Sequence, residues 1–446
     1  MPRWRMPTCA SAALAAAGLL LSGCANPSVG SANDDPTKPV TLKFWHGWST
    51  PGEVKAVNDS IDRFEKLHPN IKVQATGNVS DETINQALRA GGSKAPDVVS
   101  SFTTNNVGQY CDSGMWADLD PFMKKTGLDK EKVFPKALLD YTSYQGNQCA
   151  LPLLADAFGM YYNKDAYKKA GIKRPPRTMS ELAKVSKKLT VRSGRNSYKQ
   201  VGYLPNFRFY QNSPDRLFAQ WGPKYFDAEG NSRLADDPST YKFFKTARQL
   251  ASAQGGFNDL ERFRLTFGDE MSGQNAFLTG KVTMHLDGEW RGLMLDEAKA
   301  KFDWGVAPMP VPDDQADTYG RGFITGTVAG IAHSSKHQNA AWELVRFLTA
   351  DTKQVVSFAN AIHNVPSTFA ALKSPDLDAD PTFRTFFDIL ENKHSKALPP
   401  STNGGAYVVS LMDFAYSVEA GRGGDLRGRL KKLDEQIDAD TLQSKS

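Results

Sequence analysis

Val40-Thr41-Leu42-Lys43-Phe44-Trp45-His46 opens the segment that decides the fold class. The stretch alternates and is rich in strand-forming residues, which predicts a β-strand. Thr50-Pro51-Gly52-Glu53 then predicts a helix start, with Thr as the cap, Pro at the first helical position and Glu completing a capping box. Apolar residues recur at helical spacing as far as His68-Pro69, where we expect the helix to stop.

The same alternation of strand and helix continues along the chain. Strands are expected at 71–75 and 97–102, with a helix at 81–90 between them. Three strands and two helices in about 60 residues predict a parallel sheet covered by helices. Later strands are expected at 151–154, 160–162, 282–286 and 302–308, and helices at 180–189 and 339–348. The sequence therefore predicts an α/β fold with a helix-rich last third.

Length and net charge narrow the possible domain organisation and the possible partners. About 400 residues follow residue 39, more than a single hydrophobic core usually holds, so two lobes are expected. Removing Arg3 and Arg5 with the signal described below leaves 52 of the 54 basic side chains against 49 acidic ones, a net charge of +3. With no basic block in the sequence, nucleic acid is not an expected partner.

The first 23 residues have the pattern of a secretory signal peptide. Arg3 and Arg5 precede an uncharged Ala/Leu-rich run, and the cut falls among small residues. Leu21-Ser22-Gly23-Cys24 resembles a bacterial lipobox, so Cys24 is the expected lipid anchor on the outer face of the cell membrane; an ordinary signal peptide is the alternative. Residues 24–39 are rich in Asn, Asp, Ser, Gly and Pro and are expected to form a flexible tether. Beyond them no apolar run approaches the ~18 residues of a membrane-spanning helix.

Two cysteines remain in the mature chain. Cys9 leaves with the signal and Cys24 carries the lipid, so Cys111 and Cys149 are left. Outside the cytoplasm two cysteines most simply form a disulfide, and two free thiols are the alternative. No metal or other cofactor is expected, because His46 has no second histidine or cysteine at ligand spacing.

Several segments, taken together and in order, resemble the extracellular solute-binding proteins of carbohydrate ABC transporters, the family of maltose- and glycerol-phosphate-binding proteins. The segments are 42–48 (LKFWHGW), 64–73 (FEKLHPNIKV), 95–99 (APDVV), 151–165 (LPLLADAFGMYYNKD), 275–284 (NAFLTGKVTM) with Gly288-Glu289-Trp290, and 334–348 (SSKHQNAAWELVRFL). The resemblance implies a periplasmic-binding-protein-like fold of type II, in which two α/β lobes joined by a hinge close on a ligand. It implies a first lobe of residues 40–150 plus about 300–350, and a second lobe of 151–299 plus about 351–446.

The resemblance also implies a function. The chain would be the substrate-binding component of an ABC importer, a monomer without catalytic activity that binds a mono- or oligosaccharide and delivers it to permease subunits. A sugar presents hydroxyls in a plane and C–H faces above and below, so its site needs planar polar groups and aromatic rings. In a buried site each unmatched polar group costs about 1–3 kcal/mol, which is a source of selectivity.

Five candidate ligand-binding residues lie at strand ends or motif positions of the first half of the chain. Trp45, His46 and Trp48 end the first strand, where ligands bind in open α/β sheets, and a core role for Trp45 is the alternative. Asp156 could accept two hydroxyls, and a surface or hinge aspartate is the alternative. Phe102, with Ser101 and Thr103, ends the third strand.

Tyr210, with Gln211, is a further candidate. The remaining candidates lie in the second half of the chain. Trp290 follows a strand and opens a helix, where the family often stacks a tryptophan on the sugar. Gly322 and Phe323 lie in 320–326 (GRGFITG), whose spacing and following strand exclude a dinucleotide-binding loop. Asn403 belongs to a late contact region, and the absence of arginine between Ser401 and Tyr416 weighs against a phosphorylated ligand.

Other functions remain open at this point. Within the binding class, the ligand could be a glycerophosphodiester or a polyol. An extracellular glycoside hydrolase would need two carboxylates that flank the scissile bond, and no spacing in the sequence singles out such a pair. HExxH, GxSxG and P-loop motifs are absent from the sequence, and a peptide or adhesion receptor has no motif in its favour.

Overall fold

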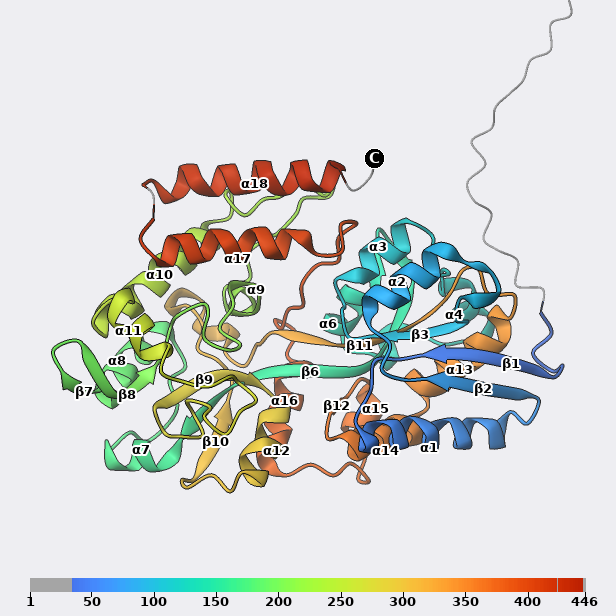
Figure 1. Ribbon diagram of the computed structural model, residues 1–446, viewed down its shortest axis with the longest axis horizontal. Helices are drawn as coiled ribbons and strands as arrows, with labels where there is room; N and C mark the ends of the chain where they lie inside the picture. The colour runs from blue at the N-terminus through green and yellow to red at the C-terminus, as the bar shows by residue number, and fades with distance from the viewer. Residues whose placement is uncertain (1–33, 423, 444–446) are drawn as a thin grey trace, which may run out of the picture. The chain divides into compact units, whose positions relative to one another are not determined.

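The computed structural model describes residues 34–422 and 424–443 (Figure 1). The predicted signal peptide, the expected lipidation site Cys24 and the tether up to residue 33 lie outside the described residues. Within the described ranges, no helix is long and apolar enough to cross a bilayer.

The first three strands form the expected parallel sheet, in which β1 pairs with both β2 and β3. The elements follow the predicted order: β1 (Val40–Trp45), α1 (Pro51–Leu67), β2 (Ile71–Thr76), α2 (Asp81–Ala90) and β3 (Val98–Ser101). Helix α1 begins as predicted, because the Thr50 side chain accepts a hydrogen bond from the Glu53 N–H and the Glu53 carboxylate accepts one from the Thr50 N–H.

Further strands extend this sheet to the order β2-β1-β3-β11-β6-β9-β8-β7 (Figure 1). The added strands are β6 (Ala150–Asn163), β7 (Val191–Gly194), β8 (Ser197–Tyr203), β9 (Val282–Gly288) and β11 (Ile324–Ile331), while β10 (Trp304–Ala307) and β12 (Val365–Pro366) pair with β6 outside this order. A separate hairpin joins β4 (Ser143–Tyr144) to β5 (Asn147–Gln148).

The longer helices confirm the predictions at 180–189 and 339–348 and the helix-rich last third. They are α8 (Met179–Leu189), α10 (Pro238–Ala253), α13 (Gln338–Ala350), α14 (Thr352–Ile362), α16 (Pro381–Glu391), α17 (Ala406–Glu419) and α18 (Leu426–Gln443). The shorter helices are α3 (Asn106–Asp112), α4 (Asp120–Thr126), α5 (Lys130–Val133), α6 (Lys136–Thr142), α7 (Lys164–Lys169), α9 (Pro214–Leu217), α11 (Phe257–Arg264), α12 (Trp290–Glu297) and α15 (Phe369–Leu372).

Strand β6 replaces the two separate strands predicted at 151–154 and 160–162 with one continuous strand of 14 residues. Its first part pairs with β11 and residues 158–162 pair with β9. Because β11 pairs with Asp156 through Thr325, the ladder keeps this polar position extended. The prediction of two strands was wrong, because the pattern of polar and apolar residues does not show which strands will pair with this segment.

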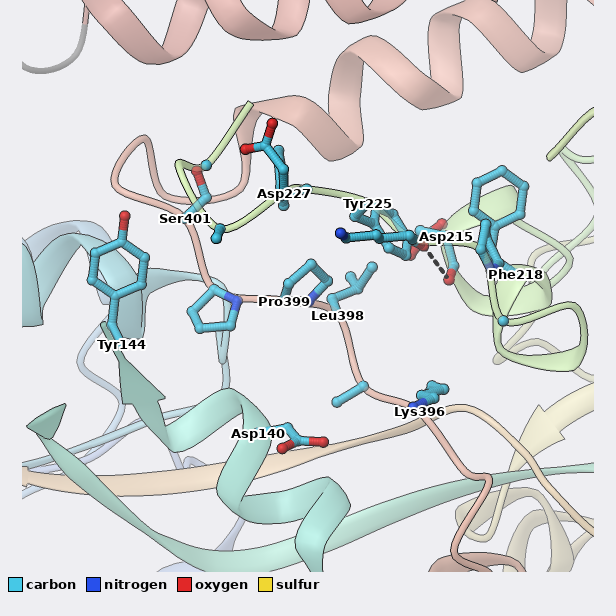
Figure 2. A pocket seen from close by; sticks show the side chains of 18 of the residues that line it. Asp140, Tyr144, Asp215, Phe218, Tyr225, Asp227, Lys396, Leu398, Pro399 and Ser401 are labelled. Atoms are coloured by element: carbon cyan, nitrogen blue, oxygen red, sulfur yellow. Dashed lines mark hydrogen bonds between the residues drawn. The ribbon is translucent and has the colours of Figure 1, made fainter. Parts of the chain in front are cut away.

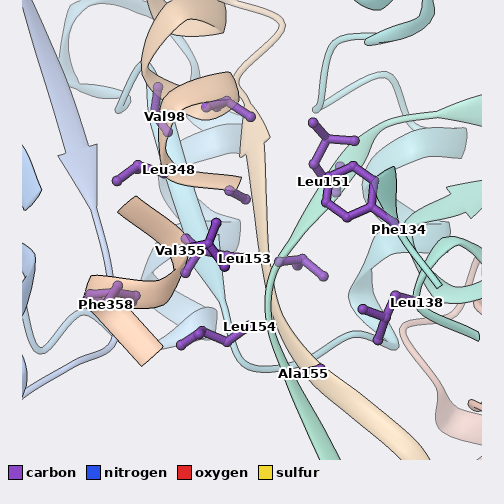
Figure 3. Close-up of a cluster of buried hydrophobic side chains, with 14 of the residues drawn as sticks. Val98, Phe134, Leu138, Leu151, Leu153, Leu154, Ala155, Leu348, Val355 and Phe358 are labelled. Atoms are coloured by element: carbon purple, nitrogen blue, oxygen red, sulfur yellow. The ribbon is translucent and has the colours of Figure 1, made fainter. Parts of the chain in front are cut away.

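Buried apolar side chains form two main clusters, one centred in each lobe, and the first also includes side chains of α12 and α16 and packs against β10. The first surrounds β1–β3 and the beginning of β6, and the second surrounds β9 together with α8, α10, α17 and α18. Figure 3 shows the first half of β6 between Phe134 and Leu138 on one side and Val355 and Phe358 of α14 on the other. β6 runs through both lobes, and β11 pairs with it as far as residue 157. Residue 396 forms a bridge with residue 323, just before β11, so the segment 395–402 is a further connection.

Two predicted lobe boundaries are corrected by these contacts. Helix α14 packs against α1 and α13, and the apolar residues of α14 and α15 belong to the first cluster, so residues 352–372 lie in the first lobe. Strand β10 pairs with residues 160–163 of β6, the part that β9 flanks on its other edge, and therefore belongs with the second lobe. The sequence pattern identifies a strand or a helix. It does not show which strand edge a strand pairs with or which surface a helix packs against.

Asp34 fixes the beginning of the described chain. Its carboxylate accepts hydrogen bonds from the backbone N–H groups of Asn339 (2.9 Å) and Ala340 (3.1 Å), at the start of α13. A carboxylate at this end of a helix is stabilised by the free N–H groups and by the helix dipole. The last residues of the expected tether are thus anchored, and any flexible tether ends before Asp34.

Cys111 and Cys149 form the predicted disulfide, with their Cα atoms 5.7 Å apart. The bond joins the end of α3 to the residue that precedes β6. The alternative of two free thiols is therefore excluded.

Cutting this disulfide should lower the stability of the first lobe. Closing a loop with a sequence separation of 38 residues restricts the unfolded chain, and the loop-entropy relation gives about 4 kcal/mol for a loop of this size. Urea unfolding of the oxidised protein, the reduced protein and Cys149→Ser should show both disulfide-free forms unfolding at lower urea. Equal midpoints for all three would mean that the bond does not stabilise the fold.

Candidate ligand-binding site

The site is centred on Asp156, at the point where β6 changes partners. On one edge of β6, Ala155 pairs with Val365 of β12 and Phe158 pairs with Gly288 of β9. The residues that border this gap are Asn364, which precedes β12, and Glu289, which follows β9. The strand register therefore brings both side chains to Asp156 from segments more than 70 residues apart in sequence.

Asp156 and Glu289 are neighbouring carboxyl groups, because Glu289 accepts a hydrogen bond from the backbone of Ala157, the residue after Asp156. Asn364 Nδ2 donates a hydrogen bond to Asp156 Oδ1 (3.1 Å), and the Ala157 N–H donates one to Glu289 Oε2 (3.2 Å). Burial raises the pKa of Asp156, and burial together with the neighbouring Asp156 charge raises the pKa of Glu289 well above its ordinary value. Burial thus disfavours the charged form of both carboxyl groups.

Two polar atoms beside this pair are buried and have no partner among the described residues. They are the indole Nε1 of Trp290, a donor, and the amide Oδ1 of Asn364, an acceptor. Leaving such a group unpaired costs about 1–3 kcal/mol. A hydroxyl group both donates and accepts, so a polyhydroxylated ligand could satisfy both atoms.

Trp290 begins α12 as predicted and supplies an aromatic surface at the same place. Its ring folds back over Gly288, where an added Cβ would lie 2.1 Å from the ring, so glycine is required for this position. The ring meets Phe158 edge-on, with centroids 5.4 Å apart. Phe158 lies two residues after Asp156 on the same face of β6, and it also contacts Phe323 (5.1 Å) and the Arg216 guanidinium (5.7 Å).

The predicted residues at the ends of the first-lobe strands divide into core and surface. Trp48 is 3% exposed and packs edge-on against Phe102 and Phe358, and the partly buried Trp45 packs against the first cluster. His46 lies between the rings of Phe44 and Trp48, and burial lowers the pKa of His46 to about 4, so it is neutral. Phe102 is 47% exposed, and its ring covers Gly47.

Three other predicted residues already have partners within the protein. The Tyr210 hydroxyl donates to the Gly268 carbonyl (3.0 Å) and accepts from the Ala276 N–H (2.9 Å). Asn403 Oδ1 accepts from the Ala406 N–H (3.1 Å) at the start of α17. At Gly322 an added Cβ would lie 2.5 Å from Ile389, so this glycine permits close packing of α16.

A cavity of about 660 Å³ also lies between the lobes (Figure 2). Tyr144 of the β4–β5 hairpin, the segment 222–230 and the connection 396–402 line it, and Phe323 is the one of the ten predicted residues that does so. Asp215 lines it as well, with Oδ1 buried and unpaired. The cavity neighbours the Asp156 centre through the contact of Phe323 with Phe158.

Glu289, Asn364 and Phe158 are site residues that the sequence analysis missed. Glu289 stood beside the predicted Trp290 in a strand-to-helix turn, which is a usable signal for a functional position. Asn364 has no comparable signal, because it reaches Asp156 only through the pairing of β12 with β6. No group of three or more metal-ligating side chains occurs among the residues that the structure describes.

Comparisons with known proteins agree with this architecture. The family described as bacterial extracellular solute-binding protein matches residues 47–355. The maltotriose-binding protein of Pyrococcus abyssi is 22% identical over 398 residues, which cover 88% of this chain and 81% of the relative. The sn-glycerol-3-phosphate-binding periplasmic protein UgpB of Pectobacterium atrosepticum is 26% identical over 345 residues, 74% of each chain.

A solved structure, "CpMnBP1 with Mannotriose Bound", superposes with a TM-score of 0.72 at 22% identity and covers 89% of this chain and 99% of its own. This likeness confirms the predicted fold of two α/β lobes. Together with the family match over more than half of the sequence, it shows that the chain belongs to the bacterial extracellular solute-binding proteins.

Proposed function

We propose that this protein is the substrate-binding component of an ABC importer that captures a neutral carbohydrate at the Asp156 centre and delivers it to a membrane permease. Membership of an extracellular solute-binding family supports binding outside the cytoplasm. The relative named for maltotriose and the neighbour that holds mannotriose support an oligosaccharide as the ligand.

The observation that carries the proposal is the combination of unpaired polar atoms and an aromatic surface around Asp156. Trp290 Nε1 and Asn364 Oδ1 have no hydrogen-bond partner within residues 34–422 and 424–443, and Asp156 is partly exposed beside them. A sugar could donate hydroxyl hydrogens to Asp156 and Asn364, accept the indole N–H, and place a C–H face on an aromatic ring.

The charges at this centre argue against a phosphorylated ligand. A phosphate beside Asp156 would meet a partly buried carboxylate, and like charges at short distance are strongly unfavourable. A glycerophosphodiester therefore fits less well, although one relative is named for sn-glycerol 3-phosphate. A polyol could form hydrogen bonds with the polar atoms, but it has no sugar ring whose C–H face could stack on the aromatic surface.

The same pair argues against a glycoside hydrolase. Such enzymes hold their two carboxyl groups roughly 5–9.5 Å apart, with the scissile bond between them. Glu289 is buried and accepts a hydrogen bond from the backbone of Ala157, next to Asp156, so the two carboxyl groups do not face each other across an open space.

The experiment that tests the proposal uses the chain from Ala25 onward, without lipid. Calorimetric titration with mono-, di- and oligosaccharides, a polyol and glycerophosphocholine should give one-to-one binding of a neutral sugar, which chromatography then recovers unchanged. Binding of glycerophosphocholine alone would replace the sugar proposal, and hydrolysed sugar would indicate an enzyme.

Replacing Trp290 should weaken sugar binding without unfolding the empty protein. Trp290→Ala loses both the ring and the N–H, and we expect at least a tenfold rise in Kd, which is ~1.4 kcal/mol. Trp290→Phe keeps an aromatic face and should lose less. Thermal unfolding of each empty variant is the control, and a large drop in Tm for Trp290→Ala would show that the ring is structural.

Removing the charge of Asp156 should also weaken binding, because hydrogen bonds to a charged group contribute about 1.5–3 kcal/mol. We expect Asp156→Asn to raise Kd roughly ten- to hundredfold. The matched variant Asp215→Asn changes a carboxylate in the 660 Å³ cavity and should leave Kd within about threefold of the original. The reverse pattern would place the ligand in that cavity.

We further infer that lipid on Cys24 anchors the mature, monomeric protein to the cell membrane. The support is the sequence Leu21-Ser22-Gly23-Cys24 behind a charged and then apolar segment. In bacteria grown with labelled palmitate, the full chain should carry label in the membrane fraction and Cys24→Ser should not. Label retained by Cys24→Ser would rule out this anchor.

A further inference from the structure

We propose that Arg291 is a positioning residue, which through a buried ion pair with Asp287 directs the Trp290 ring toward the ligand. The inference deepens the proposed function and rests on it for the ligand. It adds a group that does not touch the sugar but fixes the residue that does.

Asp287 links the two sides of the turn that carries Trp290. The turn, residues 287–291 (DGEWR), leads from the end of β9 into the start of α12. Asp287 Oδ1 accepts a hydrogen bond from the Gly288 N–H (2.9 Å), and Oδ2 accepts one from Arg291 Nε (2.6 Å). One carboxylate therefore binds the last residue of the strand and the second residue of the helix, and Trp290 lies between them.

The Arg291 guanidinium is also fixed on its other side. Its Nη2 donates a hydrogen bond to the Glu270 carbonyl oxygen (3.0 Å) and lies 3.5 Å from Glu270 Oε1. Glu270 is held in turn by Gln211, whose Nε2 lies 2.7 and 2.8 Å from the two carboxylate oxygens. A guanidinium offers several N–H donors in a rigid planar fork, so it can bridge Asp287 and Glu270 at once, which the compact ammonium of a lysine cannot do in the same geometry.

The backbone of the same turn is tied to β6. The Tyr161 hydroxyl lies 2.9 Å from the Gly288 carbonyl oxygen and 3.3 Å from that of Glu289. β6 also carries Asp156, so the turn and the polar centre share one support. With its backbone held by β6 and its two ends joined by one carboxylate, the turn has little freedom to change direction.

Trp290 itself is only partly enclosed. Its ring lies over Gly288 and meets Phe158 edge-on. The residue remains partly exposed, unlike Asp287 and Arg291, whose exposed fractions are 0% and 3%. The packing of its own ring therefore does not fix Trp290 from every side. The buried pair supplies the restraint that the open side lacks, and it leaves that side free for a ligand.

Stability alone does not account for a charged pair in this position. Removing two charges from water has a cost that offsets their attraction, so apolar residues of similar volume often stabilise a fold equally well. Apolar side chains would fill the space without specifying a direction, whereas the pair donates and accepts at defined atoms. The direction of the turn is therefore the property that the pair adds.

The first test needs no ligand and measures the mobility of each tryptophan indole by NMR. Of the eight tryptophans, only Trp4 lies before Ala25, so the chain from Ala25 onward should give seven indole N–H signals, which single Trp→Phe changes assign. We compare the unchanged protein with Asp287→Asn/Arg291→Met, which removes both charges together. The heteronuclear NOE of the Trp290 indole should fall, while those of the first-lobe tryptophans should not change. An unchanged NOE at Trp290 would overturn the positioning role.

Two further variants separate this role from other effects. Arg291→Lys keeps a positive charge beside Asp287 and should fold even if the double change does not, yet it loses the fork and should lower the same NOE. Arg264→Met/Glu261→Gln removes an ion pair (2.7 Å) within α11 and should leave the NOE of Trp290 unchanged. A fall at all seven indoles would indicate general loosening of the fold and would contradict the specific role.

Calorimetric titration with maltotriose and mannotriose tests the consequence for binding. For the sugar that the unchanged protein binds, Asp287→Asn/Arg291→Met should raise Kd at least about tenfold, whereas Arg264→Met/Glu261→Gln should keep Kd within about threefold. An unchanged Kd together with a more mobile Trp290 would overturn the ligand role of the pair. Failure of both sugars to bind the unchanged protein would count against the proposed function, while the NMR series would still decide whether the pair positions Trp290.

Discussion

The change of partners along β6 is the constraint on which the rest of this structure depends. β11 lies along one edge of the strand across the boundary between the lobes, while the other edge passes from β12 to β9. Backbone groups on both edges of a strand need hydrogen-bond partners. The gap between β12 and β9 along this edge of β6 is therefore short. The residues that border this gap carry the polar chemistry of the site. The element that joins the lobes thus also positions the binding groups.

Burial gives this centre a different character from an exposed group of polar side chains. Near the surface, Asp156 and Glu289 would both be charged and water would pair their free atoms. In the low-dielectric interior, burial raises the pKa of both carboxyl groups, and each unpaired atom has a cost that a matching ligand removes. A site of this kind favours recognition of hydroxyl groups.

The aromatic residues show why position in the sequence is a weak guide to ligand contact. Trp48 and His46 end the first strand, where the family often places ligand-facing rings, yet both pack into the first lobe beside Phe358 of α14. Their burial follows from the docking of α14 on the first lobe, which was expected in the second. Trp290 lies beside the polar centre because the glycine before Glu289 lets its ring fold back.

The sequence by itself determined the fold class, the capping box of α1, the parallel order of the first strands, the Cys111–Cys149 pair, and Asp156 and Trp290 as residues of interest. These features depend on local periodicity, on residue chemistry, or on the small number of ways two cysteines can pair. Tertiary structure alone decided that β6 is continuous, that α14 belongs to the first lobe, and that Glu289 and Asn364 meet at Asp156. Each of these depends on which strand edges and helix faces come together across long separations, and no local pattern encodes that choice.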